Sequence, residues 1–197
     1  MKKIMFNDKY GLTQAVLDGQ KTMTRRIARG EIQLGNWEET EKYSHYQVGE
    51  VVAIAQSYNQ IGISSTMYCE VPNEYGGTRD GSFEELAGWE NKMFVKADLM
   101  PHHIKITNIR IERLQEISNV DCLREGIVMD NTIGYYVEGL KCKDWEKESH
   151  IEMENGETLK LFPTPREAFA ALIDKVSGRG TWDSNPMVWV YEFELVD

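Results

Sequence analysis

The chain has 197 residues, of which 41% are hydrophobic and 27% are charged, and these proportions are those of an ordinary globular protein. Its formal net charge is −10, which argues against a broad surface that coats nucleic acid, so no extended surface for duplex DNA is expected. A small pocket for one nucleotide or a short RNA feature remains compatible with this charge. The length predicts a single domain over residues 1–197.

The cysteines and the hydropathy pattern predict a cytoplasmic protein. Cys69, Cys122 and Cys142 are odd in number and share no close spacing, so they indicate neither a disulfide framework nor a metal site, and they suit a reducing compartment. No stretch approaches the roughly 20 apolar residues of a membrane span, and no apolar run of signal-peptide length follows the first residues. We therefore expect no membrane partner.

The first part of the chain is basic, although the whole chain is acidic. Residues 1–30 hold seven Lys and Arg against two Asp, a local charge of +5, so residues 31–197 carry −15. The cations concentrate in residues 18–26, which read DGQKTMTRR. Because the local field rather than the net charge steers a ligand, this segment is a candidate anion site. The alternative is a solvated basic strand.

The N-terminal pattern predicts a short helix followed by an extended segment. Apolar residues at helical spacing predict a helix over 7–18, capped by Asn7 or Asp8 and ended by Gly19. In a strand over 21–28, side chains alternate between two faces. One face would carry Lys21, Met23, Arg25 and Ile27, and the other would carry Thr22, Thr24 and Arg26. Residues 30–46 are polar and are expected to form a loop.

Four further strands are predicted, over residues 51–58, 92–97, 104–114 and 187–195. In the third of these, the apolar phase shifts between Thr107 and Asn108, as a β-bulge or a barrel corner requires. Helices are predicted to start at Ser118, with Glu125 at the end of the helix, and at Thr164. The regions 59–91 and 128–162 lack a clean period and are expected to be inserted loops.

These elements predict an α+β fold, in which a small and mostly antiparallel β-barrel is flanked by about three short helices. Many of the strands are not separated by helices, so a doubly wound parallel sheet fits less well. The four histidines lack the spacing of metal ligands, and no phosphate-binding glycine loop or serine elbow occurs. We therefore expect neither a metal nor a cofactor.

The candidate chemistry lies in the basic segment. Lys21 stands near Arg25 and Arg26, and repulsion between like charges lowers a lysine pKa and frees its amine as a base. Thr24 supplies a hydroxyl. Glu125 at the end of its helix is most simply a solvated side chain, but it opposes the helix dipole there, and this mildly unfavourable position adds some weight to a role at the site. Beyond these residues, Trp182 in a loop could stack on a base, or it could pack in the core.

Several of these segments resemble the ASCH family, the activating-signal-cointegrator homology domains, and most closely its longer branch from phages and bacterial prophages. The resemblance covers nearly the whole chain in the family order. The matching segments are residues 17–26, 46–52, 110–117, 124–127 and 181–186.

The resemblance implies a PUA-like barrel with a cleft at its mouth that holds RNA or a nucleotide. A branch of small proteins in the family removes the acetyl group from the exocyclic amine of acetylated cytidine. Its catalytic lysine, threonine and glutamate correspond to Lys21, Thr24 and Glu125. This chain departs from that branch by its two inserted regions and by Arg25 and Arg26 after the threonine.

Three hypotheses follow from the residues and the resemblance. The first is a domain that binds RNA, a nucleotide or a modified nucleoside in a cationic cleft, with Arg25 and Arg26 on phosphate and with Thr22 and Trp182 nearby. The second is an amidohydrolase of acetylated cytidine that uses Lys21, Thr24 and Glu125. The third is a protein-interaction module that binds through its acidic inserted regions.

Overall fold

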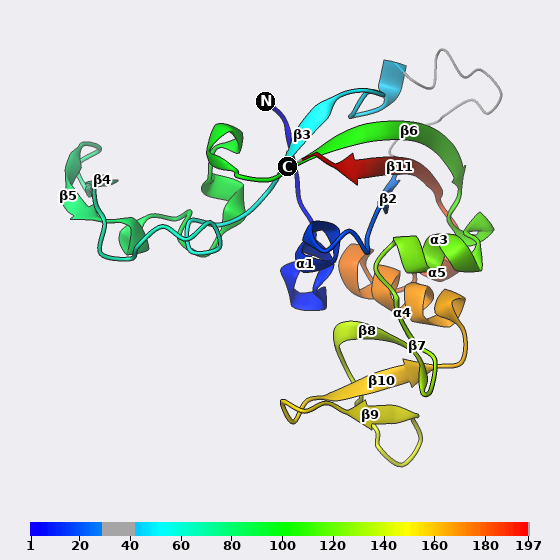
Figure 1. Ribbon diagram of the computed structural model, residues 1–197. Coiled ribbons are helices and arrows are strands. Elements are labelled where there is room, and N and C mark those ends of the chain that lie inside the picture. The colour runs from blue at the N-terminus through cyan, green and yellow to red at the C-terminus, as the bar shows by residue number, and fades with distance from the viewer. Residues whose placement is uncertain (29–41, 197) are drawn as a thin grey trace. The chain divides into compact units, whose positions relative to one another are not determined.

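The computed structural model describes residues 1–28 and 42–196 (Figure 1). It confirms the predicted α+β class. The part of the predicted 30–46 loop that precedes residue 42 lies outside the described residues. The chain divides into two compact units, and the prediction of a single domain stays a prediction. The first unit comprises Met1–Phe6, Val51–Ile104 and Val196–Asp197, and the second comprises Asn7–Glu50 and Lys105–Leu195.

Three neighbouring strands of a sheet position the basic segment in the second unit. They are hydrogen-bonded in the order β6, β11, β2. Antiparallel pairing sets Thr24 opposite Tyr191 and Arg25 opposite Val190. Because side chains alternate along both strands, Thr24 and Arg25 lie on opposite faces of the sheet, as predicted. The strands are β2 (Met23–Ile27), β6 (His103–Arg113) and β11 (Met187–Leu195).

The predicted phase shift in the middle of β6 is confirmed by burial. Ile106 and Ile109 are buried, whereas Thr107 and Asn108 between them are both exposed. The strand curves strongly along its length (Figure 1). No sheet made by the described residues closes into a barrel, so the PUA-like barrel stays a prediction. None of the described helices is both long and apolar enough to span a bilayer.

The helices of the second unit begin and end largely at the predicted residues. Asn7 caps a 3-10 turn, and Gly11 with a φ of 63° separates it from the next helix, so the predicted 7–18 helix is interrupted. Ser118 and Thr164 cap their helices as predicted. The elements are η1 (Asp8–Tyr10), α1 (Leu12–Leu17), α3 (Asn119–Arg124), α4 (Pro165–Ser177) and α5 (Thr181–Ser184).

The region 128–162 is an antiparallel sheet, and the prediction of an inserted loop was wrong there. Its strands are hydrogen-bonded in the order β7, β8, β10, β9, and α4 packs against β8 and β10. Positive φ angles at Gly134 and Gly139, and a register shift between Leu159 and Leu161, break the alternation that a sequence pattern would reveal. The strands are β7 (Val128–Asp130), β8 (Gly134–Lys141), β9 (His150–Glu152) and β10 (Thr158–Phe162).

The first unit is built on the parallel pair β1 (Lys3–Ile4) and β3 (Val51–Ile54). The region 59–91 is more regular than predicted, because β4 (Tyr68–Pro72) and β5 (Thr78–Ser82) form an antiparallel hairpin within it, followed by the 3-10 turn η2 (Phe83–Glu85). A small core of Ala53, Val95 and Met100 holds the unit together.

The predicted strand over 92–97 was wrong. Residues Lys92–Phe94 form a 3-10 turn, η3, and Ala97–Leu99 form another, η4. The side chain of Asn91 caps the first turn by accepting a hydrogen bond from the Met93 amide. The Lys3 ammonium donates to the carbonyls of Lys92, Met93 and Val95 at 2.7–2.9 Å, so these carbonyls are satisfied without a neighbouring strand.

Candidate functional site

Lys21 lies between α1 and β2, and its side chain turns inward. Gly19 takes a φ of 71°, a left-handed conformation that ends α1, and the Lys21 amide then donates to the Ala15 carbonyl at 2.8 Å. The residue is only 2% exposed. Its Nζ donates to Glu125 Oε2 at 2.7 Å and to the carbonyls of Met23 and Glu125 at 2.7 and 2.8 Å. The lysine is therefore held in one place by at least three acceptors.

The electrostatic balance at Lys21 lowers its pKa. Burial is the largest cause, because it penalises the charged form. The Glu125 carboxylate opposes this shift, and the nearby charges of Arg26 and Arg25 add to it. The predicted direction of the shift is thus the same as the one found here, but its main cause is burial rather than repulsion between cations.

Glu125 stands at the end of α3 and is 4% exposed. Its Oε2 accepts from Lys21, and its Oε1 accepts from Arg25 Nη1 at 3.1 Å. The helix dipole opposes a carboxylate at this end, and the two cations offset that cost. Gly126 follows with a φ of 99°, and a Cβ there would lie 3.1 Å from the Leu12 side chain. A buried carboxylate, Glu125, therefore comes directly before a left-handed turn at Gly126.

Arg25 is buried, and its guanidinium contacts three carboxylates. Its side chain is 0% exposed. Nε and Nη2 donate to Glu112 Oε1 at 3.0 and 2.6 Å, and Nη2 also donates to Asp121 Oδ2 at 3.1 Å. Burial disfavours the charged form, but the Glu125 and Glu112 carboxylates outweigh it and raise the pKa of Arg25. The guanidinium that was predicted to hold phosphate is occupied by side chains of this protein.

The ion pairs around Arg25 extend across the sheet. Arg110 Nε donates to Glu112 Oε2 at 2.9 Å, and its Nη2 donates to Asp121 Oδ2 at 2.8 Å. Arg110 and Arg124 both pair with Glu192 on β11. We call this set the charge cluster, and its formal charges sum to zero. Its members are Lys21, Arg25, Arg110, Arg124, Glu112, Asp121, Glu125 and Glu192.

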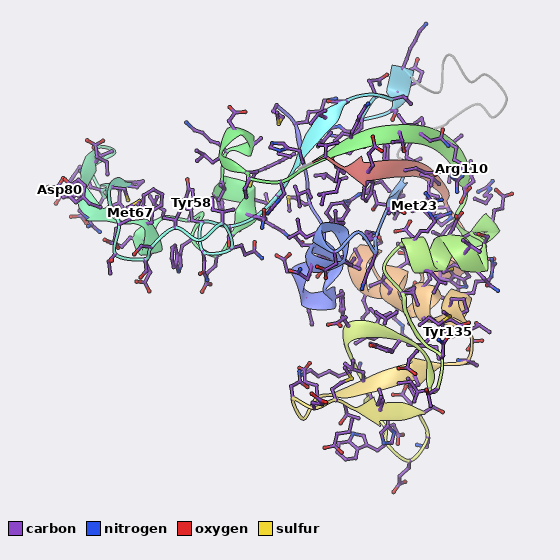
Figure 2. All side chains as sticks on the ribbon, viewed as in Figure 1. Met23, Tyr58, Met67, Asp80, Arg110 and Tyr135 are labelled. Carbon is purple, nitrogen blue, oxygen red and sulfur yellow. The ribbon has the colours of Figure 1, made fainter. Side chains whose placement is uncertain are left out.

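Two further side chains contact the charge cluster. Met23 Sδ lies 3.1 Å from Arg25 Nη1, and Met23 is near Arg110 in Figure 2. Thr22 joins the edge of the cluster, because its hydroxyl accepts from Arg124 Nε at 3.1 Å. Thr22 was predicted to lie near a ligand, and the structure places its hydroxyl on a cluster arginine.

Thr24 lies on the other face of β2, opposite Tyr191. It is 5% exposed, and among the described residues its hydroxyl forms no hydrogen bond. Arg26 shares this face by alternation and lies opposite Trp189. The Tyr46 ring packs edge-on against Tyr191 with centroids 5.1 Å apart. We call this set (Thr24, Arg26, Tyr46, Trp189 and Tyr191) the aromatic face.

The aromatic face is ordered by hydrogen bonds of its own. Ser44 Oγ donates to the Tyr46 carbonyl at 2.7 Å and lies 3.1 Å from the Tyr191 hydroxyl. Burial raises the pKa of Tyr46 to about 12, while the charge of Arg26 acts in the opposite direction. Tyr46 is therefore neutral at physiological pH and is near enough to Arg26 to feel its charge.

The structure sorts the predicted residues differently from the sequence. We expected a reactive pair of Lys21 with Thr24 and a phosphate-binding pair of Arg25 with Arg26. Instead, Lys21 and Arg25 meet at Glu125, while Thr24 and Arg26 share the aromatic face. Within the described residues, no hydrogen bond joins Thr24 to Lys21 or to Glu125.

Trp182 is fixed by α4. Its ring packs edge-on against Phe169, with centroids 6.2 Å apart, and the Arg166 guanidinium lies 5.3 Å from the ring centroid. The Trp182 amide donates to Asp174 at 2.8 Å. These contacts give Trp182 a packing role on α4, and they supply no link to Lys21 or Glu125.

The sequence interpretation missed most of the charge cluster. Glu112, Asp121, Arg110, Arg124 and Glu192 were not named as site residues. One signal was present, because Glu192 follows the buried valines of β11 in the same alternating phase, where an apolar residue is expected. Arg110 and Glu112, two residues apart on β6, offered a second signal.

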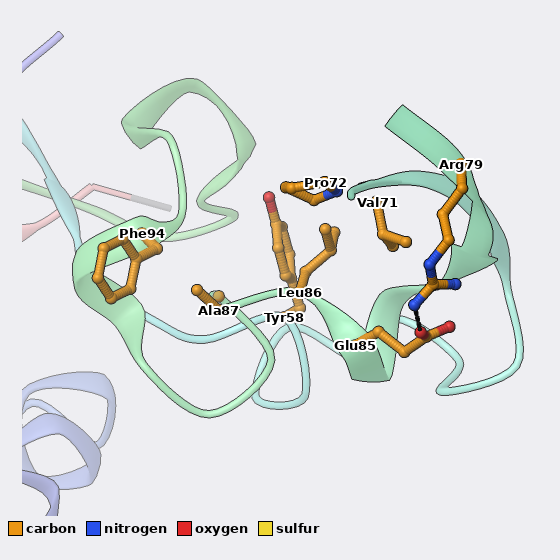
Figure 3. Close-up of a pocket in the computed structure, with 9 residues that line it drawn as sticks. Tyr58, Val71, Pro72, Arg79, Glu85, Leu86, Ala87 and Phe94 are labelled. Atoms are coloured by element: carbon orange, nitrogen blue, oxygen red, sulfur yellow. Dashed lines mark hydrogen bonds and ion pairs between the residues drawn. The ribbon is translucent and has the colours of Figure 1, made fainter. Parts of the chain in front are cut away.

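Hollows also lie elsewhere among the described residues, and two of them are described here. One of about 90 Å³ lies beside α1 and Gly126 and carries the acidic Asp18 and Glu138. The other, of about 420 Å³, belongs to the first unit, where Tyr58 and Phe94 line it and an Arg79–Glu85 ion pair closes one end (Figure 3). Among the described residues, no group of His, Cys, Asp and Glu is arranged to hold a metal ion.

Comparisons with protein-family models, with curated proteins and with solved structures find no match to this chain.

Proposed function

We propose that the protein is a PUA-like ASCH domain that binds a nucleotide or a modified nucleoside, either free or within single-stranded RNA, at the aromatic face. The observation that carries this proposal is the Thr24 side chain, which lies opposite Tyr191, is 5% exposed and forms no hydrogen bond with the described residues. A hydrogen bond from a ligand to this hydroxyl would contribute about 0.5–1.5 kcal/mol to binding.

The other residues of the aromatic face suit the same ligand. An arginine guanidinium binds phosphate or stacks on a base, and Arg26 is next to both Thr24 and the tyrosines. Because the charge cluster sums to zero, Arg25 is assigned to its carboxylates and not to phosphate in this proposal. We therefore expect a small ligand or a short single-stranded segment, and a weak dependence of affinity on salt, with a slope of about −0.7 for one phosphate contact.

Binding measurements test the role of Thr24. We expect Thr24→Val to weaken the binding of cytidine, acetylated cytidine and short single-stranded RNA about tenfold, because valine keeps the shape but removes the hydroxyl. Thr24→Ser, which keeps the hydroxyl, serves as the matched control and should bind like the wild type.

Arg26→Gln should weaken the binding of nucleotides more than the binding of nucleosides. Arg79→Gln in the first unit changes the net charge by the same amount and should leave the affinity for both ligands unchanged. The proposal fails if no ligand binds at low salt or if Thr24→Val binds unchanged.

A second candidate function is hydrolysis of the acetyl group on acetylated cytidine. The specific observation is the buried Lys21–Glu125 pair, with its 2.7 Å contact and its lowered lysine pKa. A neutral lysine amine has two N–H bonds and one lone pair, so it would give up one of its three donated hydrogen bonds. Its lone pair would take a proton from water as the water oxygen bonds to the acyl carbon. The C–N bond then breaks, the protonated lysine returns the proton to the leaving amine, and acetate and cytidine are released. Glu125 holds the lysine throughout.

Acetate release decides this second candidate. With acetylated cytidine as substrate, we expect Lys21→Met to lower kcat at least about 100-fold, because a positioned proton-transfer group contributes that much. Lys143→Met, which removes an exposed lysine, should keep full activity. If the wild type releases no acetate, or if a folded Lys21→Met protein keeps full activity, the protein is not this hydrolase.

A further inference from the structure

We propose that Arg25 is a positioning residue: it fixes the Glu125 carboxylate against Lys21, and Glu112 in turn fixes Arg25. This inference rests on the proposed function, because it takes the Lys21–Glu125 pair to be part of the working site. It assigns Arg25 a role through other residues and not through contact with a ligand.

The donors of Arg25 are the first support. All three of its nitrogens face carboxylates: Nε and Nη2 donate to Glu112, Nη2 also donates to Asp121, and Nη1 donates to Glu125. The side chain is 0% exposed. A guanidinium presents its donors in a rigid planar fork, so these contacts fix its orientation as well as its charge. All three nitrogens of the guanidinium therefore donate hydrogen bonds to side chains of the protein.

The shared carboxylate of Glu125 is the second support. Its two oxygens are divided between two cations, with Lys21 on Oε2 at 2.7 Å and Arg25 on Oε1 at 3.1 Å. A carboxylate held at both oxygens cannot rotate without breaking one of the contacts. Removal of Arg25 would therefore free the carboxylate to turn about the Lys21 contact.

Glu112 supplies the third support, because it links Arg25 to the rest of the sheet. Its Oε1 accepts from Arg25, and its Oε2 accepts from Arg110 Nε at 2.9 Å. Arg110 is in turn paired with Glu192 on β11. Buried ion pairs contribute little net stability compared with apolar side chains of similar size, so stability alone is a weak reason for such an arrangement. Fixing the geometry of Glu125 and Lys21 is a sufficient reason.

The charge of Arg25 also acts on the proton affinity of Lys21. The charged groups that act on Lys21 are Glu125, Arg25 and Arg26. Removal of Arg25 takes away a like charge, and it also leaves more of the negative charge of Glu125 to act on the lysine. Both effects raise the pKa of Lys21 as long as Glu125 Oε2 keeps its contact with Nζ.

The test is a titration of Lys21 by NMR, with lysine labelled at the side-chain carbon and the Lys21 signal identified by its loss in Lys21→Arg. In Arg25→Met we expect the midpoint to move up. In Arg25→Lys, which keeps a charge but lacks the fork, we expect a smaller upward shift. Arg79→Met in the first unit is the matched control and should leave the midpoint where it is in the wild type.

Activity and binding give the second readout. If acetate is released, Arg25→Met should lower kcat about 10- to 100-fold with a small change in KM, and should move the pH profile in step with Lys21. An unchanged Lys21 midpoint in the folded Arg25 variants overturns the positioning role. Should the wild type neither bind nor cleave any nucleoside, the proposed function fails by itself, while the titration still decides what Arg25 does. If Arg25→Met does not fold, Arg25→Lys decides.

Discussion

Replacement of Glu125 by leucine is expected to lower the free energy of unfolding by about 3–5 kcal/mol, because it leaves the buried cations of Lys21 and Arg25 without their shared anion. Lys21→Met should lower the free energy of unfolding by a smaller amount than Glu125→Leu, because Glu125 then keeps its contact with Arg25. The order of the two costs follows directly from the division of the Glu125 oxygens between two cations. Equal costs would contradict this arrangement.

Denaturant unfolding of the two single variants and of the double variant measures this effect. Since Lys21 and Glu125 are in direct contact, the double variant should lose less than the sum of the single losses. Glu154→Leu, at an exposed position, is the matched control and should change the free energy of unfolding by no more than about 0.5 kcal/mol. Additive losses would show that the two side chains are not coupled.

Alkaline pH is expected to destabilise the protein steeply. Burial raises the pKa of the Cys122 thiol from 9.0 to about 12, so the folded state keeps a proton that the unfolded state releases. The stability from this group is complete below pH 9 and is lost as the pH rises toward 12, by about 2–4 kcal/mol. Tyr46 adds a loss between pH 10 and 12, because its pKa is also raised.

Lys21 acts in the opposite direction over part of this range. Its pKa is lowered from 10.5, so the unfolded state binds the extra proton, and stability from this group rises with pH up to about 10.5. Unfolding curves at pH 8 to 12, under reducing conditions, separate the contributions. We expect Cys122→Ala to reduce the fall in the free energy of unfolding that begins near pH 9. Cys69→Ala should show the same fall as the wild type. Identical pH profiles for the wild type and Cys122→Ala would contradict the burial of the thiol.

The predictions that depend on local pattern were the most successful. Ser118 and Thr164 are helix caps that act on their own first turns, so their effect is readable in four residues of sequence. The last strand and the phase shift in β6 are also local, because each depends only on alternation along one segment. The left-handed turn at Gly19 belongs to the same class.

The partners of the basic segment could not be predicted in the same way. Arg25 is 87 residues from Glu112 and 100 from Glu125, so these contacts depend on how β2, β6 and α3 come together. The sequence indicated that Lys21 and Glu125 act together only through a resemblance. The prediction that Arg25 binds phosphate was made without regard to the excess of carboxylates in this acidic chain. A buried arginine in such a chain pairs with these carboxylates.

The pairing of β2 with β11 determines where this fold can tolerate an inserted or deleted residue. Because adjacent residues of β2 serve two different surfaces, removal or addition of one residue between Gly19 and Met23 would turn Arg25 toward the tyrosines and Thr24 toward the carboxylates. The three-residue connection at 20–22 is thus fixed in length. By contrast, a Cβ added at Gly156, in the turn between β9 and β10, would meet no atom within 4 Å, so we expect inserted residues to be tolerated there.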